Sequence, residues 1–329
     1  MIMEVEPGWR EPTLATLTQR RFSSENWLFE RKLDGVRAIC ARDGSTPTLW
    51  SRNHNDVSAS YPEIVEALAE LGGTHFVVDG EIVAFDGQQT SFAKLQQRIH
   101  LTDRRRIEAT GVRVYYYLFD LLVFDHADAG RLPLRQRKQL LRKAFDWEDP
   151  LRYSSHRNAD GEEYFRYACE HGWEGLIAKR ADSLYRPGRS PDWLKFKCVK
   201  DQEFVVGGYT LPGGSRSGFG ALLVGYYDRG KLRYAGKVGT GYNEAALREL
   251  SATMGEIRRD RSPFAEPIPE RGARWVEPKL VVQVTFSEWT SDGRLRHPRY
   301  TGLREDKLAA DVVREQLPIR PKAGGTGRR

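Results

Sequence analysis

Lys32-Leu33-Asp34-Gly35-Val36-Arg37 is the stretch of this 329-residue sequence that restricts its fold and function most. It follows Trp27–Arg31, a strand-like segment that begins with the apolar residues Trp27, Leu28 and Phe29. A single K-x-D-G-x-R motif has low specificity, and a solvated turn is the better explanation of an isolated copy. The meaning of the motif therefore depends on the residues that accompany it along the chain.

Further motifs follow this one in a fixed order. They are Ser51-Arg52-Asn53, Asp79-Gly80-Glu81, Leu118-Phe119-Asp120, Glu174-Gly175-Leu176-Ile177-Ala178-Lys179, Trp193-Leu194-Lys195-Phe196-Lys197 and Arg304-Glu305-Asp306-Lys307. This ordered set resembles the collinear motifs of the covalent nucleotidyltransferases, the superfamily of ATP-dependent DNA ligases and messenger-RNA capping enzymes. The resemblance extends over nearly the whole chain.

Within that superfamily, three segments resemble the ATP-dependent DNA ligases of bacteria and archaea, particularly the ligase module of bacterial end-joining enzymes. These segments are Phe92–Arg98, Gly236–Gly241 and Glu288–Pro298. The resemblance implies a monomeric ATP-dependent DNA ligase that acts in DNA repair on nicked double-stranded DNA. It would join a 5′-phosphate to a 3′-hydroxyl through a lysyl–AMP intermediate and a DNA-adenylate. A DNA end-binding protein or a repair polymerase is the kind of protein partner that fits this role.

Composition agrees with a soluble globular chain. The sequence holds 52 Lys+Arg and 45 Asp+Glu, a net charge of 52 − 45 = +7, with 40% apolar residues and a mean hydropathy of −0.60. No apolar run approaches the roughly 18 residues of a membrane span, and Met1–Glu4 opens no signal segment. We therefore expect no membrane association and a cytoplasmic, nucleoid-associated protein. The positive charge permits a nucleic-acid partner without proving one.

The cysteines indicate neither a disulfide framework nor a zinc module. Cys40, Cys169 and Cys198 are odd in number, far apart and in no C-x-x-C pair. We expect reduced, mostly buried thiols.

The first part of the chain mixes strand and helix patterns. Strand-like segments are Phe76–Phe85, Val112–Phe124, Glu174–Lys179 and Trp193–Lys197, and helical patterns cover Leu134–Phe145 and Glu162–His171. Because the elements do not alternate in a regular βαβ rhythm, the expected class is α+β. The resemblance implies that residues 1–199 form a nucleotidyltransferase domain, an ATP-grasp-like adenylation domain.

After Lys200 the pattern changes to short strands separated by Gly-rich turns, interrupted by one helix from Asn243 to about Arg258. This pattern predicts a small closed β-barrel of the oligonucleotide-binding (OB) type over residues 200–318. A last helix is expected at about Asp306–Gln316. The Pro/Gly-rich basic tail, residues 319–329, is expected to be disordered.

Lys32 is the expected nucleophile. A lysine attacks the α-phosphorus of a nucleotide only when neutral, and an ordinary ammonium has a pKa of about 10.4. We therefore expect the pKa of Lys32 to be depressed by a bound Mg²⁺ and by the cation of Lys195.

Glu81 and Glu174 are the candidate ligands for Mg²⁺ (or Mn²⁺), which prefers carboxylate oxygens. Surface salt bridges would explain either glutamate considered alone. The resemblance implies that the residue matching Glu81 contacts the ribose and that the one matching Glu174 supports the metal.

Phe119 is expected to stack on adenine, with core packing as the alternative explanation. Lys195 and Lys197 share one face of a strand, which is unfavourable unless an anion such as a phosphate lies beside them. The other expected ATP-binding residues are Glu30, Asp34, Arg37, Arg52 and Arg189.

Arg304, Asp306 and Lys307 lie far along the chain from Lys32. By resemblance, they orient the β- and γ-phosphates so that pyrophosphate leaves in line with the attacking lysine. They can do so only if the barrel closes over the nucleotide and later opens for DNA. The alternative is that they merely begin the last helix.

Two other functions remain open at this point. An RNA ligase or a capping guanylyltransferase would share the lysine and the carboxylates, and a single-strand-binding protein would use only the barrel. For duplex DNA, we expect backbone contacts from Arg98–Arg106 and Gly213–Arg216, since residues 1–27 are too short for the helical DNA-binding domain of longer ligases. Such contacts predict binding that weakens steeply with salt.

Overall fold

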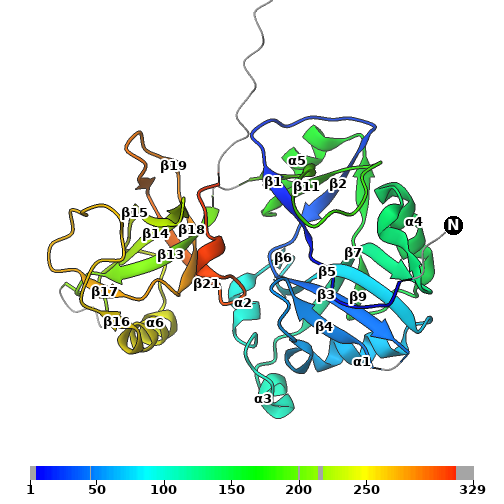
Figure 1. Ribbon diagram of the computed structural model, residues 1–329, viewed down its shortest axis with the longest axis horizontal. Coiled ribbons are helices and arrows are strands. Elements are labelled where there is room, and N and C mark those ends of the chain that lie inside the picture. The colour runs from blue at the N-terminus through cyan, green and yellow to red at the C-terminus, as the bar shows by residue number, and fades with distance from the viewer. Residues whose placement is uncertain (1–4, 45, 199–200, 214–217, 316–329) are drawn as a thin grey trace, which may run out of the picture.

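The computed structural model describes residues 5–44, 46–198, 201–213 and 218–315 of the chain. Figure 1 shows two domains side by side. The N-terminal domain contains two sheets, and the C-terminal domain contains one large curled sheet and the two-stranded sheet of β19 (Glu288–Trp289) and β20 (Leu295–Arg296). The predicted α+β class, an adenylation domain followed by an OB-type barrel, is confirmed.

The first sheet of the N-terminal domain has the strand order β4-β3-β5-β7-β8. Its strands are β3 (Val36–Asp43), β4 (Thr48–Ser51), β5 (His75–Asp86), β7 (Val114–Phe124) and β8 (Ala127–Asp128), with β6 (Gln89–Thr90) paired to β5 and β9 (Leu151–Tyr153) paired to β7. The long central strands are rich in apolar residues because both of their faces are covered. Helices α1 (Pro62–Glu70) and α4 (Leu134–Ala144) contribute buried leucines to this packing.

The second sheet has the order β1-β12-β11-β2-β10 and forms the wall of the functional site. Its strands are β1 (Thr13–Leu17), β2 (Trp27–Lys32), β10 (His156–Asn158), β11 (Gly175–Arg180) and β12 (Gly188–Lys197), and α5 (Gly161–Glu170) packs on β11. The register pairs Gly175 with Lys32 on one side and with Lys197 on the other. Three motifs from distant parts of the sequence therefore meet at one point.

Gly175 permits that meeting. Its φ of +148° is one that L side chains rarely adopt, and a Cβ there would collide with the backbone of Phe196. Because Gly175 has no side chain, the backbone of β12 can approach β11 at the residue that follows Glu174.

The C-terminal domain is built around β13 (Asp201–Tyr209), which pairs with β14, β17 and β18. The other elements are β14 (Leu222–Asp228), β15 (Lys231–Val238), α6 (Glu244–Glu256), β16 (Arg258–Arg259), β17 (Arg274–Val276), β18 (Val281–Thr285), β19 (Glu288–Trp289), β20 (Leu295–Arg296) and β21 (Arg299–Leu303). Phe204, Leu222 and Val284 are fully buried in its core. Two short helices of the N-terminal domain, α2 (Phe92–Gln96) and α3 (Arg104–Ala109), follow β6, and α2 packs against β21.

The predicted helix at Asp306–Gln316 is wrong over the residues that the structure describes. Only Ala309–Asp311 forms a short 3₁₀ turn; Val312 then has an extended backbone, and Val313 forms a β-bridge with Tyr227. The backbone of Val312 accepts a hydrogen bond from Tyr227 of β14, so pairing with a strand replaces helix formation. The predicted basic tail lies outside the described residues.

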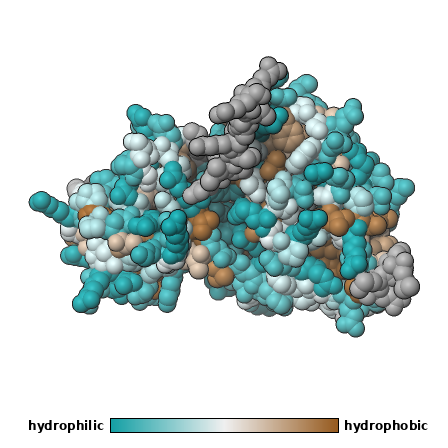
Figure 2. Space-filling view, turned by 45° about the horizontal axis from the view of Figure 1, so that its top comes forward, coloured by the Kyte–Doolittle hydropathy of each residue, from teal (hydrophilic) through white to brown (hydrophobic). Residues whose placement is uncertain are grey.

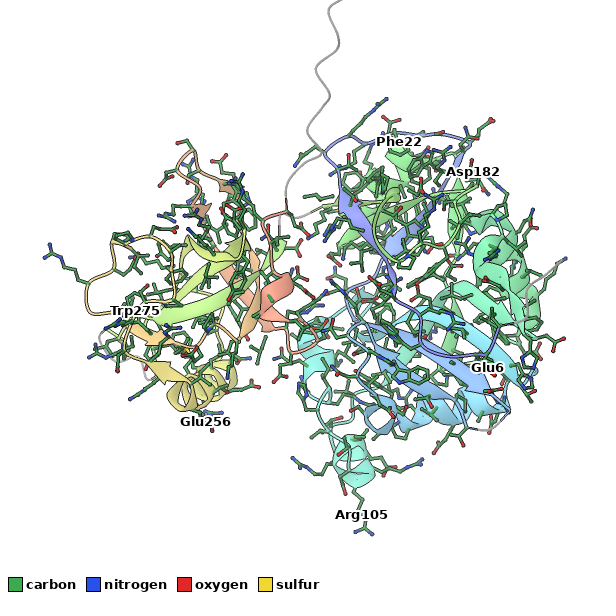
Figure 3. The ribbon with its side chains drawn as sticks, viewed as in Figure 1. Glu6, Phe22, Arg105, Asp182, Glu256 and Trp275 are labelled. Carbon is green, nitrogen blue, oxygen red and sulfur yellow. A yellow bond between two sulfur atoms is a disulfide. The ribbon has the colours of Figure 1, made fainter. Side chains whose placement is uncertain are left out.

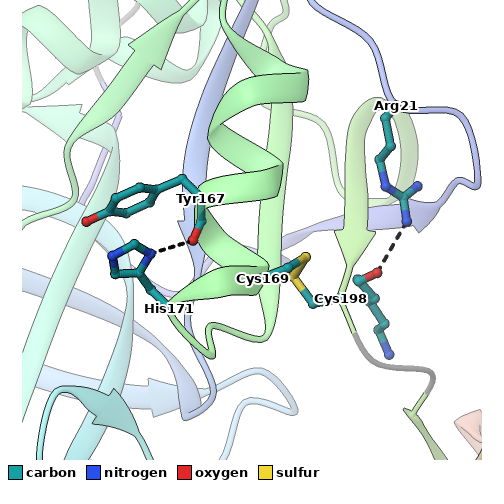
Figure 4. The surroundings of a disulfide bond; sticks show 6 residues. Arg21, Tyr167, Cys169, His171 and Cys198 are labelled. Atoms are coloured by element: carbon teal, nitrogen blue, oxygen red, sulfur yellow. Dashed lines mark hydrogen bonds between the residues drawn. A yellow bond between two sulfur atoms is a disulfide. The ribbon is translucent and has the colours of Figure 1, made fainter.

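The expectation of reduced cysteines is wrong for one pair. Cys169 on α5 and Cys198 after β12 form a disulfide, with a Cα–Cα distance of 5.3 Å (Figure 4). Cys40 is a free, buried thiol as predicted. A helix packed on a sheet brought together two residues whose sequence spacing gave no sign of proximity.

The face of the molecule in Figure 2 is mainly hydrophilic and is hollowed between the two domains. Among the described helices, none is long and apolar enough to cross a membrane.

Candidate active site

A cavity of about 580 Å³ lies between the two domains, a volume that suits a nucleotide. Every residue predicted for the site lines it: Glu30, Lys32, Asp34, Arg37, Arg52, Glu81, Phe119, Glu174, Arg189, Lys195, Lys197, Arg304, Asp306 and Lys307. Strands β2, β5, β7, β11 and β12 supply most of the N-terminal side, and the segment after β21 supplies the C-terminal side.

Lys32 ends β2 and forms an ion pair with Glu174 at the start of β11. Burial disfavours the ammonium, but the Glu174 carboxylate outweighs this effect and raises the pKa of Lys32. The predicted depression of that pKa is therefore absent from the unliganded protein. We expected the cation of Lys195 to lower the pKa of Lys32. The positive charge that acts in this direction belongs to Lys197.

The two candidate metal ligands, Glu81 and Glu174, both lie near Lys32. Burial raises the pKa of Glu81 to about 7 and also raises the pKa of Glu174. The Oε2 atom of Glu174 is buried and has no hydrogen-bond partner. Among the described residues, no three His, Cys, Asp or Glu side chains form a group that could hold a metal ion.

Lys195 and Lys197 point into the cavity side by side, and carboxylates of the chain itself lie beside them. Lys195 pairs with Glu315, while Lys197 lies 3.1 Å from Asp201 and 3.5 Å from Glu315. Burial and the neighbouring Lys197 lower the pKa of Lys195 to about 8. We expected a phosphate to offset the repulsion between the lysines; here the carboxylates of Glu315 and Asp201 do so.

Phe119 lines the opposite part of the cavity, so it does more than pack in the core. Its ring is 8% exposed and meets Trp193 edge to face, with 6.1 Å between the ring centres. The guanidinium of Arg37 and the ammonium of Lys179 lie over it at 4.6 and 4.1 Å. We call this part of the site the base end: the lining residues Glu30, Arg37, Phe119, Lys179 and Trp193, with Asp79 and Lys138 as ion-pair partners behind them.

Fixed ion pairs organise the base end. Glu30 is buried and bonded to two lysines, Lys138 at 3.0 Å and Lys179 at 2.8 Å. Asp79 holds Arg37 with two hydrogen bonds of 2.5 Å. Arg37, which we expected to bind ATP directly, is therefore already committed to a carboxylate.

Sequence reasoning missed the partners at this end, namely Lys138, Lys179, Asp79 and Trp193. Three of the four lie within motifs quoted above, so they could have been considered, whereas Lys138 belongs to a helix with no motif.

Three other predicted residues occupy the rim and floor of the cavity. Arg189 is exposed and donates to the carbonyl of Ala15 at 2.8 Å. Arg52 lies 4.0 Å from Asp311. Burial raises the pKa of Asp34, although Arg304 and Lys32 oppose the effect.

The C-terminal domain contributes the motif after β21. Arg304 forms two hydrogen bonds with Asp306, of 2.8 and 2.9 Å, and its guanidinium lies 4.2 Å from the ring of Phe92 on α2. Asn53 of the N-terminal domain donates to the Asp306 carbonyl at 3.0 Å. The two domains are therefore closed on each other.

Lys307 lies 3.4 Å from Glu203 of β13, a residue that we did not predict. Although burial acts in the opposite direction, Lys307 and Arg304 hold the pKa of Glu203 well below its usual range. We call the second part of the cavity the phosphate end: Lys195, Lys197, Asp201, Glu203, Arg304, Asp306, Lys307 and Glu315.

The predicted DNA contacts differ in accessibility. Arg98 is 2% exposed and donates hydrogen bonds to Glu63 and to two backbone carbonyls. It therefore stabilises the fold and does not contact DNA. Arg105 and Arg106 on α3 are exposed, and Figure 3 shows Arg105 pointing away from the domain. Part of the other predicted segment, Gly213–Arg216, lies outside the described residues.

Two family matches cover most of the chain. The family described as "ATP dependent DNA ligase domain" matches residues 12–197, and the "ATP dependent DNA ligase C terminal region" matches residues 215–307.

Individual relatives agree with the families. The multifunctional non-homologous end joining DNA repair protein LigD of Mycobacterium tuberculosis is 39% identical over 314 residues, which are 92% of this chain and 40% of that protein. A DNA ligase of Thermococcus fumicolans is 33% identical over 298 residues, 85% of this chain and 52% of that protein. The chain thus spans about half or less of the length of these relatives.

Among solved structures, a mycobacterial DNA ligase D complexed with ATP and MES matches with a TM-score of 0.65 at 36% identity. The match covers 92% of this chain and 97% of that one.

Proposed function

The chain belongs to the ATP-dependent DNA ligase family, and on that premise we propose that it uses ATP to seal nicks in duplex DNA through an adenylate on Lys32. The observation that carries the proposal is the position of Lys32. Its amine lies in a nucleotide-sized cavity beside Glu174, and the positive charge of Lys197 acts to lower its pKa. An aromatic ring lies at one end of this cavity and four cations at the other.

The first step is the transfer of AMP to the protein. The Lys32 amine forms a bond to the α-phosphorus of ATP, the bond to the bridging oxygen breaks, and pyrophosphate leaves. The amine must first lose a proton, and the positive charge of Lys197 favours that loss. The base end fixes the nucleotide so that the α-phosphate faces Lys32.

Glu81 and Glu174 fit a hard cation such as Mg²⁺ or Mn²⁺. Both are buried carboxylates whose pKa values are raised by burial. One Glu174 oxygen pairs with Lys32, and the other is buried without a hydrogen-bond partner, so it could serve as a ligand. When bound there, the cation would take up the Glu174 charge that now raises the pKa of Lys32 and would polarise the phosphate oxygens.

Arg304 and Lys307 bind the leaving pyrophosphate in the closed arrangement. Asp306 holds Arg304 in two hydrogen bonds, and Glu203 holds Lys307. The domains then separate, AMP passes to the 5′-phosphate of the nick, and the 3′-hydroxyl displaces it. A role in end joining, with a DNA end-binding protein or a repair polymerase as partner, follows from the mycobacterial relative.

The RNA ligase and capping alternatives lose support because both family matches are to DNA ligases. A purely binding protein would leave the charged cavity around Lys32 unexplained.

Labelling the protein with α-labelled ATP tests the proposal. The Lys32→Ala variant should form no adduct and seal no nick, whereas Lys94→Ala, which changes a lysine outside the cavity, should behave as the wild type. Undiminished labelling of Lys32→Ala would refute the assignment. Nicked, cohesive and blunt DNA, with RNA-containing strands in parallel, would then define the polynucleotide substrate.

A further inference from the structure

The segment that leaves the C-terminal domain passes through the phosphate end of the cavity. Val312 has an extended backbone and Val313 forms a β-bridge with Tyr227, and backbone and side-chain hydrogen bonds define the path of the segment to Glu315. The Tyr227 amide donates to the Val312 carbonyl at 2.7 Å. Gln202 uses both ends of its amide, donating to Val313 at 3.2 Å and accepting from the Glu315 amide at 2.9 Å. Glu315 therefore has a defined position.

The Glu315 carboxylate lies on the two lysines of the last β12 motif. It forms a hydrogen-bonded ion pair with Lys195, and its second oxygen lies 3.5 Å from Lys197. Its side chain is 13% exposed, so water screens these pairs only in part. Although burial opposes ionisation, Lys197 and Lys195 together lower the pKa of Glu315, which is therefore an anion at neutral pH.

We infer that Glu315 occupies the position of an ATP phosphate and competes with ATP for Lys195 and Lys197. This inference rests on the proposed function and adds a residue that controls substrate binding. An ammonium that holds a carboxylate cannot hold a phosphate oxygen in the same direction, so one anion must leave before the other binds. A triphosphate, which offers several anionic oxygens, can replace a single carboxylate.

Glu315 differs from the other carboxylate on these lysines. Asp201 pairs with Lys197 from four residues away, a local contact that the fold retains. Glu315 reaches Lys195 across 120 residues, from a segment beyond the last strand of the barrel. Glu315 can therefore leave the lysines without disturbing a strand. The larger the fraction of molecules in which Glu315 covers the lysines, the lower the apparent affinity for ATP.

The test is the Glu315→Gln variant of the full chain, which keeps the size of the side chain and removes its charge. Adduct formation is measured in single turnovers over a range of α-labelled ATP concentrations. The apparent Kd for ATP should fall about threefold to tenfold, with the rate at saturating ATP unchanged. Glu256→Gln, an exposed site at the end of α6 (Figure 3), makes the same change in net charge and should have no effect.

A second measurement separates this inference from the proposed function. Calorimetric titration with inorganic tripolyphosphate requires no adenylation, and Glu315→Gln should bind this probe more tightly than the wild type does. Equal binding of tripolyphosphate by the two proteins would overturn the inference, even if no adduct forms on Lys32. A lower rate at saturating ATP would also overturn it, because Glu315 would then be a positioning residue for Lys195.

Discussion

The base end and the phosphate end of the cavity both contain paired charges, but they hold them in different ways. At the base end, Glu30 and Lys179 are 3% and 2% exposed and are bonded to each other within one domain. At the phosphate end, Lys195 pairs with a carboxylate from the other domain, and both side chains are more than 10% exposed.

This difference indicates two ways of preparing a site. Fixed pairs at the base end are formed before the ligand arrives and give a rigid surface for a planar ring. At the phosphate end, the Glu315 carboxylate stands in for the ligand on Lys195 and Lys197, whereas Asp306 and Glu203 orient the cations that bind the leaving group. The first kind should fail through loss of stability, and the second through loss of one reaction step.

The largest effect should come from Glu30→Ala at the base end. The variant leaves two buried ammonium groups without a counter-ion, which should cost about 3–5 kcal/mol of the free energy of unfolding. Urea denaturation measures this loss. Glu203→Gln at the phosphate end, where both partners are partly exposed, should cost at most about 1 kcal/mol. Equal losses at the two positions would remove the distinction between the two ends.

Lys307→Ala should affect one reaction step. Adenylation of Lys32 should slow by about a hundredfold, since a cation aimed at the leaving group is lost. The sealing of a nick that already carries AMP should be unchanged, because that step releases no pyrophosphate. A comparable slowing of both steps would mean that Lys307 also binds DNA.

The pH dependence of adenylation should reveal Lys195. Its ammonium is the form that binds phosphate, and its pKa is lowered to about 8 by burial and by Lys197. The charge is largely complete below pH 8 and is lost above it, while deprotonation of Lys32, whose pKa is raised, favours adduct formation as the pH rises. The apparent second-order rate constant for adduct formation should therefore rise with pH up to about 8 and level off above it, because the two effects then offset each other. Lys195→Arg, which keeps its charge, should let the rate constant continue to rise above pH 8. A wild-type profile that rises by the same factor per pH unit below and above pH 8 would contradict the assignment.

The smallest effect should come from the exposed arginines of α3. Arg105→Ala combined with Arg106→Ala should weaken nick binding a few-fold and reduce the slope of log affinity against log salt by about 2. Fluorescence anisotropy at several salt concentrations measures both quantities. Arg98→Ala serves as the contrast, because this buried residue should lower stability and leave the salt slope unchanged. An unchanged slope in the α3 double variant would exclude this helix from the DNA contact.

Every residue that the sequence predicted for the site lines the cavity, because the motifs are short and those residue types have a chemical role in phosphate transfer. The sequence did not predict the partners that orient them. Lys179 and Glu30 are 149 residues apart, and only the pairing of β2 with β11 brings them together. The end of the chain was predicted helical from local pattern alone, whereas Tyr227 and Gln202 hold it extended. The disulfide likewise depends on how α5 packs.

The trio of Glu30, Lys138 and Lys179 also bears on how such a site can change over generations. It combines one negative and two positive groups in a buried space, so replacing Glu30 alone leaves two ammonium groups that no member of the trio balances, whereas losing either lysine leaves one balanced pair. Among homologous proteins, Glu30 should therefore change only together with its lysines, while a single lysine can be exchanged first. The glutamate would then be the last group of the base end to change.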